Sequence, residues 1–346
     1  MEESQRPSIK KIIILTIVAI VVFFAGWVAK NMYADYSASN LNMSIPLRLG
    51  GDKFTEPLLV CDANTEKESP NLGQLKNKTE TLIEQKIKDS DISVASVYFR
   101  DLKTGNQMDI NAEEKFYPAS LRKVPLMIAA LKTAEANPAI LQKVSITIKG
   151  DDQNASQEIK PTDYAKVGQT YVLGDLLEKM IRFSDNNAAY VLTSLLGIEN
   201  VKAVYDNLGV PFVVPDEKVL DNNDTDYMTS DKFSLFFQVL YNATYLNKEM
   251  SEKALQVLSE TDFNDGLVAG VPADTTVSHK YGLSTIQDQT GKPIRRELHD
   301  CGIIYYPQKP YILCVMTKNN SSLLDAERTI SEISALVYQE VNGGGK

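Results

Sequence analysis

The sequence contains 346 residues, of which 43% are hydrophobic, and this content is sufficient to bury the core of one large domain or of two smaller ones. Its formal net charge of −9 argues against a nucleic-acid-binding protein, which normally presents a basic face. The two histidines, His279 and His299, leave little material for a metal site or a Ser-His-Asp triad, and we expect neither a metal nor a cofactor.

An uninterrupted apolar run of 18 residues lies at positions 12–29. As a helix it would be about 27 Å long, enough to span most of a bilayer core of about 30 Å. Lys10 and Lys11 precede the run, so the positive-inside rule places residues 1–11 in the cytoplasm and the rest of the chain on the extracytoplasmic side of the cell membrane. The alternative is a cleavable signal peptide, whose apolar region is usually only about 7–15 residues long. Either interpretation exports the remainder of the chain.

The elements that follow are predicted in chain order. Residues 30–70 show no sustained period and are interpreted as an extracytoplasmic stalk. A helix is predicted over residues 72–88, a strand over 92–99, a turn over 101–106 and a second strand ending near Ile110. Helices are predicted from Ser120 to about Ala136, over 172–196 with an interruption at 184–187, and onward to about 260 apart from an irregular segment at 214–227. Strands return at 276–281, 296–306 and 311–317, and a helix over 323–341 closes the chain.

Strands at both ends and helices in the middle predict an α+β fold for residues 71–342. We expect an antiparallel sheet of about five strands flanked by helices, with an inserted helical subdomain at about residues 119–264. The three cysteines, Cys61, Cys301 and Cys314, do not form a disulfide framework, and each is interpreted as a buried or free thiol.

A serine and a lysine open the helix predicted at residue 120. Lys123 follows Ser120 by three positions, so it lies on the same helix face within reach of the serine oxygen. A serine hydroxyl is a weak nucleophile unless a base takes its proton, and a lysine can act as that base when burial or nearby positive charge lowers its pKa toward neutrality. The helix N-terminus also offers a backbone N–H for an oxyanion hole. The alternative is a capping serine followed by a surface lysine.

Two further motifs follow in order: Ser-Asp-Asn at residues 184–186, and Lys-Tyr-Gly at residues 280–282. Alone, the first would be a polar helix break and the second an edge-strand lysine beside a glycine. A literal Lys-Thr-Gly at residues 103–105 precedes the candidate nucleophile and lies in a predicted hairpin turn, so we set it aside. Together, the three ordered motifs indicate serine acyl transfer with lysine as the base.

The ordered motifs resemble those of the class A β-lactamase superfamily, whose wider relatives include the penicillin-binding D,D-peptidases. The similarity extends over about residues 72–341. A Tyr-Pro-Ala segment precedes Ser120, a Leu-Gly-Asp-Leu-Leu segment occupies residues 173–177, and residues 299–305 followed by 310–313 look like the last strand pair of that family.

This resemblance implies a role for each residue of the motifs. The implied catalytic groups are Ser120 as nucleophile, Lys123 as its base, Ser184 as carrier of a proton to the leaving nitrogen, and Lys280 as a source of positive potential. The implied substrate-binding groups are Asn186, Tyr281, Gly282 and Leu283, with the backbone N–H groups of Ser120 and Leu283 forming the oxyanion hole.

The sequence departs from the family pattern at two positions. Tyr281 stands where the family carries a threonine or serine whose hydroxyl helps to bind the substrate carboxylate. Glu217 begins an E-x-x-L-D sequence where the family has E-x-x-L-N, in a segment that is shorter than the family loop. Glu217 is therefore either the general base for deacylation or a solvated loop glutamate, and in the second case the acyl-enzyme would persist.

The leading hypothesis is a membrane-anchored, extracytoplasmic serine hydrolase that opens a β-lactam amide through an acyl-Ser120 intermediate. One alternative is a D,D-peptidase or penicillin-binding protein that acts on cell-wall peptides with slow deacylation, and another is a catalytically idle wall-binding protein. The expected partners are a small β-lactam or cell-wall peptide and the membrane, and no nucleic acid.

Overall fold

The computed structural model describes residues 48–58, 72–212, 227–291, 293–319 and 322–343, together with Val22, Gly26 and Lys30. The chain divides into two units, Met1–Ile45 and Pro46–Lys346. The apolar run at residues 12–29 lies outside the described residues except at two positions, and no helix among the described residues is both long and apolar enough to cross a bilayer. The second unit carries all three motifs.

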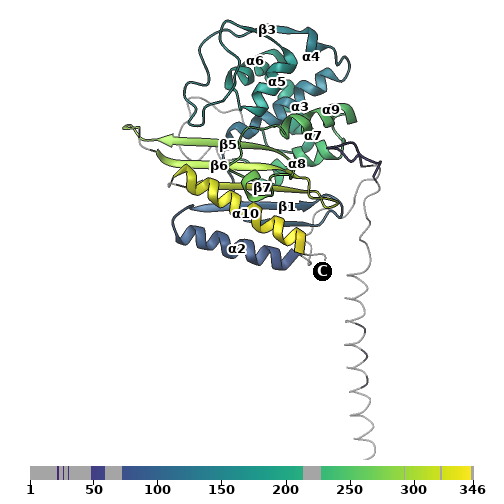
Figure 1. Ribbon diagram of the computed structural model, residues 1–346, viewed down its shortest axis with the longest axis vertical. Coiled ribbons are helices and arrows are strands. Elements are labelled where there is room, and N and C mark those ends of the chain that lie inside the picture. Colours follow the sequence, from purple (N-terminus) through teal and green to yellow (C-terminus); the bar gives the residue numbers. More distant parts are fainter. Residues whose placement is uncertain are drawn as a thin grey trace, which may run out of the picture. The chain divides into compact units, whose positions relative to one another are not determined.

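A five-stranded antiparallel sheet forms the centre of the second unit (Figure 1). Its strands are β1 (Val94–Asp101), β2 (Gln107–Ile110), β5 (Val277–Gln287), β6 (Pro293–Ile304) and β7 (Tyr311–Asn319). Their order across the sheet is β2-β1-β7-β6-β5, so strands from the two ends of the sequence meet where β1 pairs with β7. The predicted five-stranded antiparallel sheet is confirmed, and β5 forms one of its edges.

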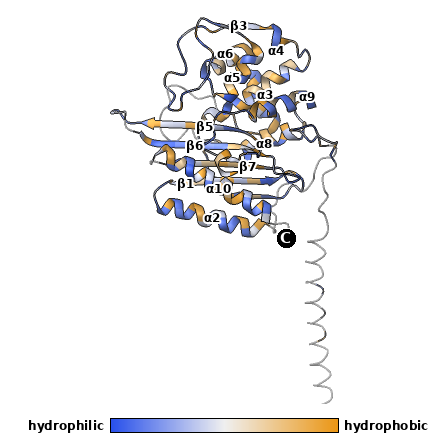
Figure 2. Ribbon diagram, viewed as in Figure 1, coloured by the Kyte–Doolittle hydropathy of each residue, from blue (hydrophilic) through white to orange (hydrophobic). Residues whose placement is uncertain are grey.

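Two helices from opposite ends of the unit cover one face of the sheet. They are α2 (Gly73–Lys88) and α10 (Leu323–Gly343), and each carries both hydrophobic and hydrophilic residues (Figure 2). Alternate residues of β1 and β7, among them Phe99 and Val315, pack here with Ile330 and Ile333 of α10. Burying one such side chain contributes about 1.5–3 kcal/mol, so this layer fixes the sheet to which the site residues of β5 belong.

The helical part packs against the opposite face of the sheet (Figure 1). Its helices are α3 (Lys123–Ala134), α4 (Ile140–Lys143), α5 (Leu173–Arg182), α6 (Asn186–Leu196), α7 (Ile198–Leu208), α8 (Ser230–Tyr241) and α9 (Lys248–Leu258). A small two-stranded sheet, β3 (Ser145–Thr147) with β4 (Thr170–Val172), and two 3-10 turns, η2 (Ala119–Arg122) and η3 (Val268–Gly270), complete the unit.

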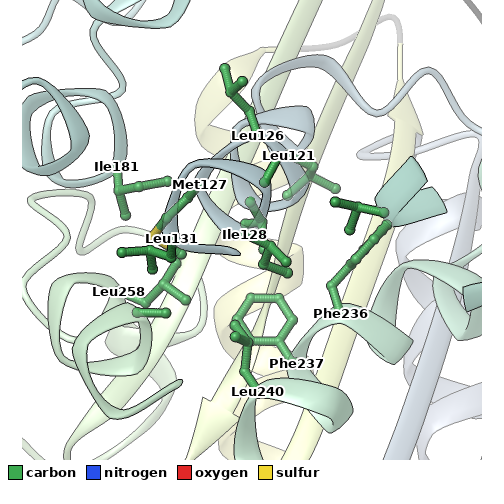
Figure 3. Close-up of a cluster of buried hydrophobic side chains, with 14 of the residues drawn as sticks. Leu121, Leu126, Met127, Ile128, Leu131, Ile181, Phe236, Phe237, Leu240 and Leu258 are labelled. Atoms are coloured by element: carbon green, nitrogen blue, oxygen red, sulfur yellow. The ribbon is translucent and has the colours of Figure 1, made fainter. Parts of the chain in front are cut away.

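Helix α3 is the central helix of this part. Every residue from Lys123 to Leu131 is buried, and its side chains pack against those of α5, α8 and α9 in the cluster shown in Figure 3. This first part of the helix is buried on all sides and has no polar face, so Lys123 is a charged side chain among apolar ones.

The predicted helix start at Ser120 differs from the structure by one turn. Residues 119–122 form the 3-10 turn η2, and the α-helix begins at Lys123. Pro125 supplies the reason. In an α-helix that included Ser120, the N–H of residue 125 would bond to the carbonyl of Leu121, and proline has no N–H. In the first turn of α3 that N–H is not needed.

The interpretation of Cys301 and Cys314 as thiols is wrong, because the structure joins them in a disulfide. The two residues lie directly opposite each other on β6 and β7, with Cα atoms 3.9 Å apart. The register of the β6–β7 hairpin creates this proximity.

Residues 48–58, within the segment predicted to be a stalk, belong to the second unit and pack against its other elements. The guanidinium of Arg48 donates to the side chain of Asn242 at 2.7 Å and to the carbonyl of Leu102 at 2.7 Å. The Glu252 carboxylate accepts the backbone N–H groups of Phe54 and Thr55 at 2.9 and 2.8 Å. This part of the stalk segment is therefore attached to the domain by buried side chains and hydrogen bonds.

Candidate active site

Ser120 and Lys123 lie where η2 passes into α3. The residue before the serine, Ala119, has φ +47°, in the left-handed region that a residue with a Cβ rarely adopts. Backbone strain of this kind persists where the surrounding structure enforces it, and it is common at active sites. The turn presents Ser120 Oγ to Lys123 Nζ, which donates to it at 3.2 Å.

The amine of Lys123 connects the first motif to the second. Besides Ser120, Lys123 Nζ donates to Ser184 O at 2.6 Å, Ser184 Oγ at 3.1 Å and Asn186 Oδ1 at 2.7 Å. Its side chain is only 5% exposed. Burial lowers the pKa of Lys123 to about 7; the positive charge of Arg122 also lowers it, and the carboxylate of Asp185 opposes both. A lysine with this pKa exchanges a proton near neutral pH.

The Ser-Asp-Asn motif forms the tight turn between α5 and α6. Ser184 has φ +56° and is completely buried. Asp185 caps α6 by accepting the N–H of Asn187 at 2.9 Å, which satisfies one free donor of the helix start. Its second carboxylate oxygen accepts the N–H of Ala165 at 2.8 Å. The aspartate of the motif therefore holds the turn, and its two neighbours face Lys123.

Asn154 is a residue of this site that the sequence analysis missed. Its Oδ1 accepts the backbone N–H of Asn186 at 2.7 Å, and its Nδ2 donates to Asp185 at 2.8 Å. Gln157 in turn donates to Asn154 Oδ1 at 2.6 Å. These polar residues belong to the connection between β3 and β4, where the sequence has no regular period. Their contact with the second motif depends on the tertiary structure.

The third motif lies on the edge strand β5, next to η2. A Cβ at Gly282 would lie 2.7 Å from Pro118 O and 3.1 Å from Leu121 N, so only glycine allows the strand to approach η2 this closely. Lys280 is 0% exposed, and its Nζ donates to the carbonyl of Tyr281 at 3.0 Å. Burial, and next the nearby charge of Lys123, lower the pKa of Lys280 well below its usual value.

A cavity of about 370 Å³ opens beside Ser120. Among the described residues, its lining comprises Tyr117, Ala119, Ser120, Arg122, Lys123, Leu126, Asn186, Ala189, Tyr190, Thr193, Ile198, Val201, Tyr205, Phe212 and Leu283. A largely apolar wall with a few converging polar groups is typical of a small-molecule site. The cavity brings together four of the predicted residues, Ser120, Lys123, Asn186 and Leu283.

A sequence model of the beta-lactamase enzyme family matches residues 74–341 of this chain. The chain belongs to the beta-lactamase enzyme family. The predicted resemblance is thereby confirmed, and the match covers the whole sheet and the helical part. No curated protein sequence matches this chain.

Solved structures of the beta-lactamase and penicillin-binding groups share this fold. PBP-A superposes with a TM-score of 0.66 at 21% identity, over 81% of this chain and 100% of that one. A class A beta-lactamase from Bacteroides cellulosilyticus gives 0.64 at 22% identity, over 78% of this chain and 99% of that one. The TLA-3 extended-spectrum beta-lactamase gives 0.67 at 20% identity, over 77% and 99%. At these identities the likeness establishes the fold.

In this beta-lactamase family member, residues of β6 bind the loop that precedes Ser120. Glu297 accepts the N–H of Tyr117 at 2.9 Å, and His299 Nε2 donates to the carbonyl of Tyr117 at 3.0 Å. Burial alone would raise the pKa of Glu297, but interaction with His299 and then with Arg295 holds it below its usual value. Glu297 has no signal in the sequence, because its contact with Tyr117 joins residues 180 positions apart.

The two positions at which this family member departs from the pattern have different outcomes. Glu217 lies outside the described residues. Tyr281 is 5% exposed, and its ring stacks against Phe263 with centroids 4.3 Å apart. Lys280 Nζ lies 4.0 Å from the centroid of the same ring, so Tyr281 contacts a residue of the third motif. The role of Glu217 stays a prediction.

Proposed function

We propose that this protein is a membrane-anchored, extracytoplasmic serine hydrolase that opens the amide of a β-lactam through an acyl-Ser120 intermediate. The observation that carries the proposal is the position of Lys123, whose Nζ lies 3.2 Å from Ser120 Oγ and 3.1 Å from Ser184 Oγ with a pKa of about 7. A base between a nucleophile and a second hydroxyl suits acyl transfer, which needs one proton removed and another delivered.

Acylation begins at Ser120. Neutral Lys123 takes the hydroxyl proton as Ser120 Oγ attacks the amide carbonyl, and the carbonyl oxygen becomes an oxyanion. The backbone N–H groups of Ser120 and Leu283 are the proposed donors to that oxygen, and both residues line the cavity. The close approach at Gly282 supports this role because it brings β5 against η2.

Collapse of the tetrahedral intermediate breaks the C–N bond. The departing nitrogen takes the proton of Ser184 Oγ, and Lys123 returns its extra proton to Ser184 across 3.1 Å. The amine is then neutral again, and Ser120 carries the acyl group. Asn186 is the proposed partner of the substrate's side-chain amide, and Lys280 supplies positive potential to the Ser184 side of the site.

Deacylation separates the β-lactamase proposal from its closest alternative. Water must attack the acyl-Ser120 carbonyl, and we propose Glu217 as the base that takes its proton. Within the described part of the chain, no carboxylate lines the cavity beside Ser120. The fold shared with PBP-A supports, as a second candidate, a D,D-peptidase or penicillin-binding protein with a long-lived acyl-enzyme.

Membrane attachment rests on the sequence. The apolar run at residues 12–29 and the lysines before it support a single span with the catalytic unit outside the cytoplasm. Fractionation tests this: the full chain should remain in the membrane after a high-salt wash, and external protease should digest the catalytic unit in spheroplasts. Recovery in the soluble cytoplasmic fraction would rule the anchor out.

The catalytic proposal is tested by mixing the detergent-solubilised full chain with a chromogenic β-lactam while following absorbance and the intact mass of the protein. Sustained turnover supports a β-lactamase. One stable adduct that is lost in Ser120→Ala supports the penicillin-binding alternative. If neither turnover nor an adduct is seen with the free acid of the β-lactam or with its methyl ester, the hydrolase proposal is wrong and an idle wall-binding protein remains.

Two lysines of α3 provide a matched pair for the proposed base. Lys123→Met should reduce acylation by at least about a hundredfold, the usual contribution of a general base. Lys132→Met removes an exposed lysine of the same helix, which pairs with Glu135, and should leave acylation unchanged. Equal losses in both variants would remove Lys123 from the mechanism.

A further inference from the structure

Tyr281 occupies a fixed position at the edge of the sheet. It lies on β5, opposite Asp300 of β6, and its ring is stacked on Phe263 with an interplanar angle of 26°. The segment that carries Phe263 is held in turn, because the N–H of the preceding residue, Asp262, donates to the carbonyl of Arg182 at 2.9 Å. Strand pairing on one side and this aromatic stack on the other leave the ring little freedom.

Lys280 also contacts the Tyr281 ring. Its Nζ lies 4.0 Å from the centroid of the Tyr281 ring, where a π-face attracts an ammonium group. The amine also donates to the carbonyl of Tyr281, and Lys280 is 0% exposed. Within the described part of the chain, no carboxylate lies within ion-pairing distance of Lys280. Tyr281 thus supplies the Lys280 amine with both a ring and a carbonyl.

Tyr281 also touches the catalytic hydroxyl of the second motif. Burial raises the pKa of Tyr281 to about 12, although hydrogen bonding with Ser184 opposes the shift, so the phenol is neutral at physiological pH. A neutral phenol can hydrogen-bond with Ser184 but cannot balance the charge of a carboxylate. Burial and the charge of Lys123 lower the pKa of Lys280, and the carboxylate of Asp300 opposes them.

We propose that Tyr281 determines specificity by covering Lys280 and closing the anion-binding position beside Ser184. The site then takes acyl donors whose leaving group carries no carboxylate at that position, such as esters, amidated peptides or lactams with a masked acid. This inference rests on the proposed acylation of Ser120 and names the substrate class of that site.

A pair of probes that differ in one group tests the inference. The full chain in detergent is reacted with a chromogenic cephalosporin bearing a free carboxylate and with the methyl ester of the same compound, and acylation of Ser120 is followed by intact mass. In the wild-type protein the ester should react at least as fast as the acid. In Tyr281→Ser the ratio of acid to ester rates should rise at least tenfold, because Lys280 becomes accessible.

Tyr281→Phe is the matched control, since it keeps the ring over Lys280 and removes only the hydroxyl. Its acid-to-ester ratio should equal that of the wild-type protein even if both rates fall. The inference is wrong if the wild-type protein prefers the acid by tenfold or more, or if a folded Tyr281→Ser keeps the wild-type ratio. If Tyr281→Ser does not fold, the acid-to-ester ratio of acylation rates in the wild-type protein tests the inference by itself.

A second measurement does not depend on acylation. The full chain is labelled with 13C at lysine Cε, the Lys280 resonance is assigned with Lys280→Arg, and sulfate is titrated against chloride at equal ionic strength. Sulfate should leave the resonance unchanged in the wild-type protein and shift it in Tyr281→Ser. A shift in the wild-type protein would overturn the inference. If neither cephalosporin acylates Ser120, the proposed function fails, and this titration still decides whether Tyr281 covers Lys280.

Discussion

The charge of Arg122 should set the pH at which Ser120 becomes reactive. Arg122 is the neighbour of Lys123 in the chain, it donates to the hydroxyl of Tyr117 at 2.8 Å, and its positive charge lowers the pKa of Lys123. Lys123 must be neutral to accept the proton of Ser120, so acylation should rise with pH through a midpoint near the pKa of about 7. The perturbation is Arg122→Gln, which removes the charge and keeps a polar side chain.

The size of the shift follows from Coulomb's law. Two unit charges about 8 Å apart at an effective dielectric constant of about 20 interact by about 2 kcal/mol, or about 1.5 pKa units. Solvent reaches the half-buried Arg122 and screens part of this, so we expect the pKa of Lys123 to rise by about one unit. The neutral fraction at pH 7 would then fall from about one half to about one tenth, which slows acylation about fivefold. At pH 9 the two proteins should react at nearly the same rate.

The assay is the first-order rate of Ser120 acylation at saturating probe, measured by rapid quench and intact mass from pH 5.5 to about 9.5, a range that brackets the lysine titration. Saturation separates the effect on Lys123 from any loss of substrate binding. Lys132→Gln removes a different cation of α3 and should keep the wild-type midpoint. A fivefold loss in Arg122→Gln that persists at pH 9, or a wild-type rate independent of pH, would refute the electrostatic reasoning.

Three further predictions concern the scaffold. Gly282→Ala should reduce acylation more than tenfold and lower the melting temperature, because its Cβ would clash with backbone atoms 2.7 and 3.1 Å away. In the control Gly73→Ala the Cβ meets nothing within 4 Å, so this variant should be neutral. Equal effects of the two substitutions would contradict this account. The pKa of Lys123 is lower in the folded chain than in the unfolded chain, so the unfolded state binds more protons between about pH 7 and 10. In that range the free energy of unfolding of the wild-type protein should rise relative to that of Lys123→Met by up to about 1.4 kcal/mol per pH unit, as measured by denaturant titration. The Cys301–Cys314 disulfide leaves one of three cysteines, so a thiol titration of the denatured, unreduced chain should find one thiol, and a value of three would rule out the disulfide.

Local patterns predicted the elements well where a period or a breaker was strong. The strand that became β1, the interruption between α5 and α6, and the closing helix α10 all lie close to their expected positions. The α-helix begins at Lys123 and not at residue 120, because Pro125 has no N–H for the helical hydrogen bond that the earlier start would require. The missed strands β3 and β4 are only three residues each, too short to show a period.

Pairing across the sheet was harder to predict. Cys301 and Cys314 are symmetric about the turn between β6 and β7, but their proximity depends on a register that one residue of slippage would change. Asn154 supports the site through two hydrogen bonds to the second motif, and Glu297 accepts the N–H of Tyr117. Residues that act through contacts with distant segments have no local signature.

The amino-acid sequence by itself determined the α+β class and which serines and lysines to examine, because helical and strand periods and the spacing of Ser120 and Lys123 are local properties. Only the tertiary structure decided that one amine, buried at Lys123, contacts both hydroxyls, and that a tyrosine ring lies over Lys280. The reason is that burial and the proximity of groups far apart in the chain set the pKa of Lys123 and the accessibility of Lys280, and both appear only when the chain is folded.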